Sequence, residues 1–307
     1  MLQCLISAII GPTKARKMHH KALQHKPDIL SGLKQLELLC PVDDITDKEE
    51  PIFLLSAGWR SGSTLLQRLI MSDSNVLMWG EPYDECGTIQ LLASSVQAFR
   101  ADWPPKDYYY DGTMPNKLSG EWIANLFPSP EDLRQSHRAL FITMFAEPAK
   151  RAGAQYWGIK EVRLGSNHCA YIRWLFPKAK FIFLYRNPLD AYRSYSVYGR
   201  NWYNTFPNKP IFTPIAFGKH WKLLMEGFLR DATKLNALVI NYEDLICENT
   251  QIEKIEAHLN ITINRNVIKN KVGGFQKREK ITDINWLEKQ LLKYAVSPIA
   301  QKIGYKW

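Results

Sequence analysis

Short apolar runs alternate with segments of helical periodicity along most of this chain. The apolar runs have the length of buried strands. They are Ile52–Leu55, Asn75–Trp79, Tyr156–Ile159, Lys180–Tyr185 and Ala237–Ile240. Helices are expected from Ser63 and over Ile89–Ala98, Pro130–Arg151, Asn167–Phe176, Phe212–Asp231 and most of the chain after Glu248. Strands that alternate with helices predict a three-layer α/β fold, in which helices flank a central parallel sheet.

The alternation starts at residue 51, and the residues before it carry little pattern. A chain of 307 residues, 46% of them apolar, is long enough for one large domain with a deep core. We therefore expect an N-terminal extension over residues 1–50 and a single domain over residues 51–307.

The chain has a net charge of +10, which favours an anionic ligand. Nucleic acid or an acidic membrane surface would also suit such a charge. Part of the excess lies in Lys14, Arg16 and Lys17 and in Lys269–Lys280, where it could serve solubility alone.

The five cysteines are scattered and no two have CxxC spacing, which argues against a disulfide framework or a zinc site and for a reducing compartment. Charge follows rather than precedes the apolar residues Met1–Ile10, the reverse of a secretory signal, and this run is too short to span a membrane. We expect a cytoplasmic protein with neither a metal site nor a membrane partner.

The segment Pro51–Ile70 predicts a strand, a glycine-containing turn and a helix. The first N–H groups of such a helix have no partner within it and face the turn, where an anion can bind. Gly58 and Gly62 allow a close approach of the backbone, and Arg60 adds positive charge. This P-loop-like arrangement lacks the GK[ST] ending of a nucleoside-triphosphate loop, because Ser63 follows Gly62 directly.

A polar or ionisable residue stands just past each predicted strand. These residues are Arg60, Glu81, Lys160, Arg186 and Tyr242. Ligands of parallel sheets bind at the carboxyl ends of the strands, so this set predicts a site for a charged ligand. The alternative is that strand ends are simply where the chain leaves the core.

A second anion site is predicted where Arg186 leaves its strand and Asn187-Pro188 begins a helix. Asp190 and Ser194 share one face of that helix at i,i+4 spacing. Two anion sites on one sheet suggest a nucleotide with phosphates at both ends of its ribose.

These residues resemble the sulfotransferases that use 3′-phosphoadenosine 5′-phosphosulfate (PAPS). The stretch SAGWRSGSTLL, from residue 56 to 66, looks like their 5′-phosphosulfate loop, and the Arg186–Ser194 motif looks like their 3′-phosphate motif. The resemblance extends from about residue 51 to 245, and more loosely to the C-terminus. Cytosolic phenol and steroid enzymes usually carry lysine in the first loop, so Arg60 makes this chain more similar to the bacterial and Golgi-type branch, which includes tyrosylprotein sulfotransferases.

The resemblance implies a set of donor-binding residues, with adenosine 3′,5′-bisphosphate as the nucleotide product. The set is Arg60, Ser61, Gly62, Ser63, Thr64, Arg186, Ser194, Tyr242, Lys277 and Arg278. Tyr242 matches the adenine-contacting tyrosine of the family, or is a core tyrosine at a strand end. Lys277 and Arg278 resemble the late basic loop, although the family pattern there is Arg-Lys-Gly, and a solvated charge run is the alternative.

Sulfuryl transfer is an in-line displacement that requires charge stabilisation and a base, and it requires no magnesium. Arg60 and Lys160 are the candidates for charge stabilisation, although Lys160 could instead pair with Glu161 or a surface acid. Val162 breaks the Lys-x-His pattern that supplies the base in phenol and steroid enzymes, and His168 is expected on the next helix. Glu81 matches the glutamate base of the arginine-loop branch, or is a turn carboxylate that caps a helix.

The acceptor is predicted from the long loop Arg100–Gly112. Its aromatic and acidic residues are Asp102, Trp103, Asp107, Tyr108, Tyr109, Tyr110 and Asp111. Together with Asp84 and Glu85 they suit a small aromatic or cationic natural product, such as a guanidinium alkaloid, sulfated on a hydroxyl or an amine. The alternative is that the tyrosines only pack the loop.

Two other classes of function compete with this interpretation. A P-loop kinase would need magnesium and ATP, and the missing GK[ST] argues against it. A nucleic-acid-binding module would bind in a strongly salt-dependent way, but the chain contains no recognised module motif.

Overall fold

The computed structural model describes residues 28–42, 48–114, 123–196, 204–205, 209–269 and 284–306. The strands of its main sheet are β1 (Ile52–Ser56), β2 (Val76–Trp79), β3 (Tyr156–Glu161), β4 (Lys180–Tyr185) and β7 (Ala237–Asn241). The helices are α3 (Ile29–Leu39), α4 (Ser63–Ile70), α5 (Thr88–Ser95), α6 (Pro130–Phe141), α7 (Glu147–Arg151), α8 (Ser166–Leu175), α9 (Pro188–Ser196), α10 (Pro214–Asp231), α11 (Tyr242–Cys247), α12 (Asn249–Leu259) and α13 (Trp286–Lys302). A short pair, β5 (Asn204–Thr205) and β6 (Lys209–Pro210), is antiparallel.

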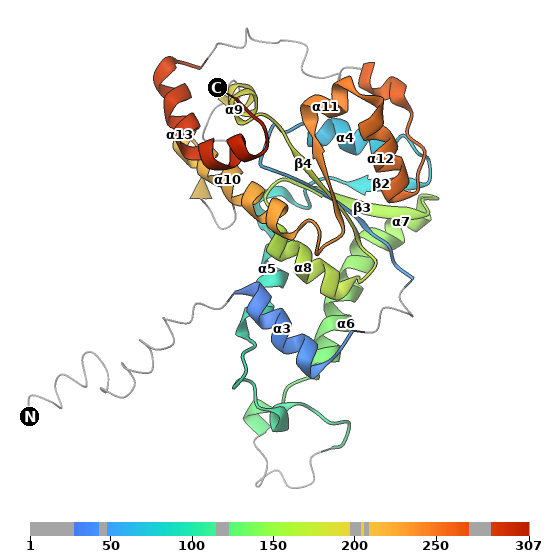
Figure 1. The fold of residues 1–307 in the computed structure, drawn as a ribbon. Helices are drawn as coiled ribbons and strands as arrows, with labels where there is room; N and C mark the ends of the chain where they lie inside the picture. Colours follow the sequence, from blue (N-terminus) through green and yellow to red (C-terminus); the bar gives the residue numbers. More distant parts are fainter. Residues whose placement is uncertain are drawn as a thin grey trace, which may run out of the picture.

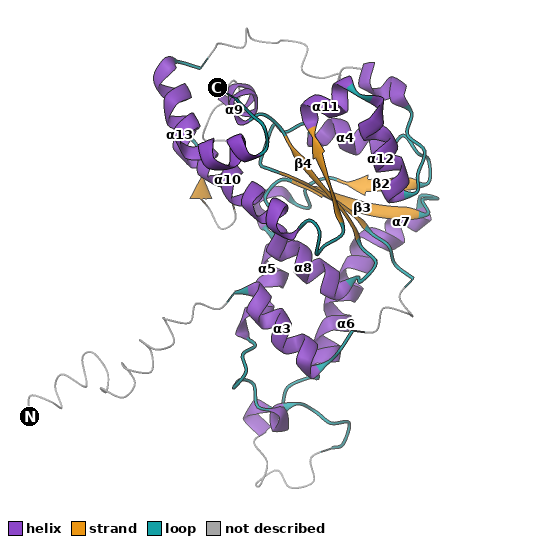
Figure 2. Cartoon of the chain, viewed as in Figure 1, coloured by secondary structure: helices purple, strands orange, loops and turns teal. Residues whose placement is uncertain are grey.

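The main sheet of the described residues has five strands in the order β2-β3-β1-β4-β7. Figure 2 shows this sheet, in orange, among the surrounding helices. Each neighbouring pair is parallel. All five strands predicted from the apolar runs are therefore confirmed, as is the parallel sheet. Because β1 lies between β3 and β4, the loops that follow these three strands are neighbours at one edge of the sheet.

Helices cover both faces of the sheet, and the side chains of the central strands alternate between them. Phe53 and Leu55 belong to the larger core cluster, with α3, α5, α8, α10 and α13. Ile52 and Leu54 belong to a second cluster, with α4, α11 and α12. This alternation is the period of a strand, and it explains why strands buried on both faces read as continuous apolar runs. The predicted three-layer fold is confirmed.

Helix α3 lies within the segment expected to be an N-terminal extension. Ile29, Leu33 and Leu36 are buried in the larger core cluster. The backbone of Gly32 approaches Val96 so closely that a Cβ on Gly32 would lie 2.0 Å from its carbonyl oxygen. This helix, in dark blue beneath α8 in Figure 1, is therefore an integral part of the packed core.

One long helical segment was predicted from Pro130 to Arg151. The structure has α6 and α7 there, joined by a π-helical stretch from Ile142 to Ala146. Ser129 caps α6 with its side chain, which accepts a hydrogen bond from the N–H of Asp132 over 3.0 Å. Within the described residues, no helix is long and apolar enough to cross a membrane.

Candidate functional site

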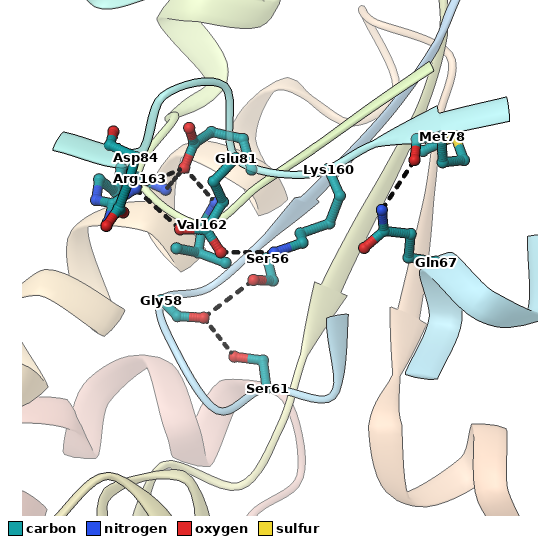
Figure 3. Close-up of polar contacts among 11 residues, drawn as sticks. Ser56, Gly58, Ser61, Gln67, Met78, Glu81, Asp84, Lys160, Val162 and Arg163 are labelled. Atoms are coloured by element: carbon teal, nitrogen blue, oxygen red, sulfur yellow. Dashed lines mark hydrogen bonds and ion pairs between the residues drawn. The ribbon is translucent and has the colours of Figure 1, made fainter. Parts of the chain in front are cut away.

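The turn between β1 and α4, here called the glycine loop (residues 57–62), is held by two serine side chains, one at the end of β1 and one within the loop (Figure 3). The Oγ of Ser56 donates to the carbonyl of Gly58 over 3.0 Å, and the Oγ of Ser61 donates to the same carbonyl over 2.8 Å. Gly58 and Gly62 have φ of 80° and 90°, values that favour glycine. The loop ends at the N-terminus of α4, whose first N–H groups have no partner within the helix.

Arg60 connects the glycine loop to the second motif. Its Nε donates to the Oγ of Ser194 in α9 over 2.9 Å. Its carbonyl accepts from Nη1 of Arg186 over 3.1 Å. Arg60 itself has φ of 63°, a left-handed conformation that costs free energy in a non-glycine residue, and the bond from Arg186 helps to hold it. The structure thus brings both predicted anion motifs to one place.

Tyr242, the first residue of α11 directly after β7, completes this group. The guanidinium carbon of Arg186 lies 4.7 Å from the centroid of the Tyr242 ring. The Tyr242 ring also contacts Gly62, where an added Cβ would lie 2.2 Å from a ring carbon. Glycine is therefore needed at position 62 for two reasons, the positive φ and the space that the Tyr242 ring occupies.

The group has features that fit a bisphosphorylated nucleoside. The Nε of Arg186 is buried and has no hydrogen-bond partner among the described residues. Ser63 is buried at the start of α4, and Thr64 is exposed next to it. An unsatisfied guanidinium N–H beside two helix N-termini is suited to phosphate oxygens. Lys277 and Arg278 lie outside the described residues.

Glu81 and Lys160 form an ion pair at the ends of neighbouring strands (Figure 3). The Nζ of Lys160 lies 2.5 Å from Oε1 of Glu81, and the two side chains are 9% and 21% exposed. The sequence offered Glu161 or a surface acid as a partner of Lys160, but the structure pairs Lys160 with Glu81. The other carboxylate oxygen of Glu81 accepts from Nη1 of Arg163 over 2.9 Å.

Arg163 and the role of Glu161 were not predicted from the sequence. Glu161 is the last residue of β3, and its Oε1 accepts from the N–H of Val162 over 2.7 Å. The pKa of Glu161 is raised to about 7, mainly by burial and then by the charge of Glu81, while the charge of Arg163 opposes both effects. The signal in the sequence was the group of three ionisable residues at the end of the strand, Lys160, Glu161 and Arg163.

His220, in the middle of α10, was also missed. Its ring packs against the Trp59 ring of the glycine loop, with centroids 4.9 Å apart and the planes tilted by 32°. The pKa of His220 is lowered to about 4, mainly by burial and also by the charge of Arg163. A backbone hydrogen bond with Val162 acts in the opposite direction. Its Nε2 is buried and has no hydrogen-bond partner in the described part of the chain. His168 starts α8 instead, where its Nδ1 accepts from the N–H of Gly165 over 3.1 Å.

The long loop Arg100–Gly112 is not brought to this site. It lies at the far end of the molecule, beyond α3 (Figure 1). Tyr108 makes edge contacts with Trp103 and Phe127, at centroid distances of 5.6 Å and 6.1 Å. The alternative that its tyrosines pack the loop agrees with these contacts. Of the acids considered for the acceptor, Asp84 reaches the site, where it pairs with Arg163.

Comparison with known proteins identifies the family. The model of the sulfotransferase family matches residues 51–265, more than half of the chain. The chain belongs to the sulfotransferase family. It is therefore a sulfotransferase enzyme, and the reaction is transfer of a sulfuryl group. No curated protein sequence matches it significantly.

Several solved structures resemble this sulfotransferase. The sulfotransferase domain from the curacin biosynthetic pathway is 16% identical, with a TM-score of 0.48 over 85% of this chain and 99% of that chain. The corresponding domain of the Synechococcus PCC 7002 olefin synthase is 16% identical, with a TM-score of 0.48 over 86% and 98%. A mouse sulfotransferase complexed with PAP is 16% identical, with a TM-score of 0.43 over 90% and 91%.

Proposed function

We propose that this enzyme transfers the sulfuryl group of PAPS to a hydroxyl or amine of a small molecule. The observation that carries the proposal is the direct contact between the two predicted anion motifs. Arg60 bonds to Ser194 over 2.9 Å and to Arg186 over 3.1 Å. One nucleotide with phosphates at both ends of its ribose can engage both motifs only if they lie side by side.

The proposed roles of the donor-binding residues are based on their positions in the two anion motifs. The glycine loop, with Arg60, Ser61 and Gly62, and the start of α4, with Ser63 and Thr64, hold the phosphosulfate. Arg186 and Ser194 hold the 3′-phosphate, and Tyr242 contacts the adenine. Lys277 and Arg278 remain candidates for closing on the 3′-phosphate. The product of the donor is adenosine 3′,5′-bisphosphate.

Glu81 is the proposed general base. As the acceptor oxygen or nitrogen forms its bond to sulfur, its proton passes to a carboxylate oxygen of Glu81, and the bond from sulfur to the bridging oxygen breaks with its electrons on the phosphate. Lys160 and Arg60 offset the charge that develops on the transferred group. The Nζ of Lys160 lies 2.5 Å from Glu81, so its ammonium adjoins the proposed base.

A cationic acceptor, such as a guanidinium natural product, fits the acids that follow Glu81. Asp84 has a side chain that is 70% exposed, and Glu85 is exposed beside it. The acids of the long loop lie elsewhere, so the support for this acceptor class comes from these two carboxylates. Transfer to a phenol that bears a guanidinium group, compared with the same phenol without it, tests the acceptor class directly.

A thermal-shift panel tests the donor class. The panel compares adenosine 3′,5′-bisphosphate, ATP with magnesium, and a DNA oligonucleotide. We expect a rise in Tm with the bisphosphate alone, because only a ligand that binds the folded state raises Tm. Stabilisation by ATP with magnesium and not by the bisphosphate would refute the PAPS proposal and favour kinase-like chemistry.

A further inference from the structure

Arg163 is buried among three carboxylates immediately after β3. Its side chain is 3% exposed and lies 2.9 Å from Glu81 and 3.5 Å from Glu161, and its Nη2 donates to Asp84 (Figure 3). A guanidinium can bond two carboxylates at once through its planar fork, which an ammonium cannot reproduce. Arg163 therefore fixes the separation of Glu81 and Asp84.

The turn after β2 (residues 80–86) needs such a support. Tyr83 and Asp84 have φ of 54° and 50°, so two consecutive non-glycine residues are left-handed. Each such residue costs on the order of 1–3 kcal/mol unless its surroundings hold it. Nη1 of Arg163 donates to the carbonyl of Asp84 over 3.4 Å, in addition to the bond with the Asp84 side chain. These bonds hold the backbone of the turn as well as its acids.

Arg163 also contacts the glycine loop. Its guanidinium carbon lies 5.7 Å from the centroid of the buried Trp59 ring, and Trp59 packs against His220. One side chain thus adjoins the loop after β1, the turn after β2 and the end of β3. The three segments that surround the place of sulfuryl transfer meet at this guanidinium.

We propose that Arg163 is a positioning residue, which sets the orientation of Glu81 and its distance from the glycine loop. It holds Oε2 of Glu81, so that Oε1 faces Lys160 and the reacting group. The inference rests on the proposed function, in which Glu81 is the base. Displacement of a catalytic group by about 1 Å can cost about a hundredfold in rate, so loss of the fork should act mainly on kcat.

The test compares Arg163→Lys with the matched control Arg134→Lys. Arg134 is equally buried, but it lies on α6 and its Nε bonds the carbonyl of Trp174 over 2.7 Å. The measured reaction is the release of labelled sulfate from ³⁵S-labelled PAPS, which requires no acceptor besides water. We expect Arg163→Lys to lower kcat at least about tenfold and to change KM for PAPS less than about twofold. Arg134→Lys should leave both unchanged.

Hydrogen exchange provides a readout that is independent of turnover. In Arg163→Lys the amides of residues 80–86 should exchange at least about tenfold faster, while the amides of β1 and β4 keep their protection. Asp84→Asn, whose side chain is 70% exposed, should fold normally and loosen the same turn to a smaller extent. Unchanged exchange in this turn together with unchanged kcat would overturn the proposal.

A double variant of Arg163→Lys with Glu81→Gln distinguishes the positioning role of Arg163 from the role of Glu81 as the base. If Arg163 acts through Glu81, Arg163→Lys should change the residual kcat of Glu81→Gln by less than about twofold. A full tenfold loss in that background would overturn the positioning role and leave the base in place. Full activity of Glu81→Gln by itself would instead refute Glu81 as the base.

Discussion

The Nε of Arg60 donates to the Oγ of Ser194 over 2.9 Å, across a separation of 134 residues in the sequence. Arg60 belongs to the glycine loop after β1, and Ser194 belongs to the helix after β4. Because β1 and β4 are adjacent parallel strands, the segments that follow them emerge at the same edge of the sheet. The contact makes the two anion motifs parts of one site.

Removal of the Ser194 hydroxyl should weaken nucleotide binding. Ser194→Ala is expected to raise the Kd for adenosine 3′,5′-bisphosphate about threefold to tenfold, since one hydrogen bond contributes about 0.5–1.5 kcal/mol. Ser196→Ala is the matched control, because the Ser196 hydroxyl bonds the carbonyl of Arg193 within the same helix. Isothermal titration calorimetry measures both. Equal affinities of the two variants would contradict a role for Ser194.

Gly62→Ala should destabilise the protein by more than the free-energy cost of a left-handed alanine, and it should also weaken the binding of the bisphosphate. Gly62 and Gly153 have nearly equal φ, 90° and 88°, but only Gly62 has a neighbour within contact distance of an added Cβ. The left-handed conformation costs alanine roughly 1–2 kcal/mol at either position, and Gly62→Ala must also displace the Tyr242 ring. Chemical denaturation should therefore show a larger loss of stability for Gly62→Ala than for Gly153→Ala. The bisphosphate affinity should fall in Gly62→Ala alone.

Lys160→Met should reduce turnover far more than donor binding. Loss of one charge that stabilises the transition state typically costs about 10²- to 10³-fold in kcat. Lys150→Met provides the comparison, because Lys150 also pairs with a glutamate, Glu49, at 2.8 Å, but with a side chain that is 54% exposed. Release of labelled sulfate from PAPS measures both variants. A loss below about threefold in Lys160→Met would remove it from the catalytic group.

The pH dependence of stability should change in opposite directions in two variants. The pKa of Glu161 is raised by burial to about 7, so the native state binds more protons than the unfolded state between about pH 4.5 and 7, and this group lowers stability as pH rises through that window. The pKa of His220 is lowered by burial to about 4, so the unfolded state binds more protons between about pH 4 and 6.5, and this group lowers stability as pH falls.

Denaturation from pH 4 to 8 measures this dependence. Relative to wild type, Glu161→Gln should become progressively more stable as pH rises from 5 to 8. His220→Gln should become relatively more stable as pH falls from 7 to 4. Stability differences that do not vary with pH in either variant would show that neither group carries its shifted pKa.

The strands and both anion motifs could be predicted because their causes are local. A strand buried on both faces is an unbroken apolar run, such as Phe181–Leu184, and the residue that follows a strand end must leave the core at the same edge as its neighbours. The glycine loop likewise carries its own turn chemistry in Gly58 and Gly62. Such features need no knowledge of how distant segments pack.

The missed features depend on packing between segments that are distant in sequence. Arg163 gains its importance from Glu81 and Asp84 on another strand's turn, and His220 from the Trp59 ring beneath α10. Helix α3 was not predicted, although Ile29, Leu33 and Leu36 have helical spacing. Whether one short helix packs into the core depends on the segments that it contacts, and these are distant in the sequence. The long loop was assigned to the acceptor by composition, which does not say where a loop lies.

The central claim is that one site holds both phosphates of the donor nucleotide. The most direct measurement compares the Kd of the wild-type enzyme for adenosine 3′,5′-bisphosphate with its Kd for adenosine 5′-monophosphate at one ionic strength. Charge-assisted bonds from Arg186 to the 3′-phosphate should make the bisphosphate bind at least about tenfold more tightly. Equal Kd values for the two nucleotides would contradict the account.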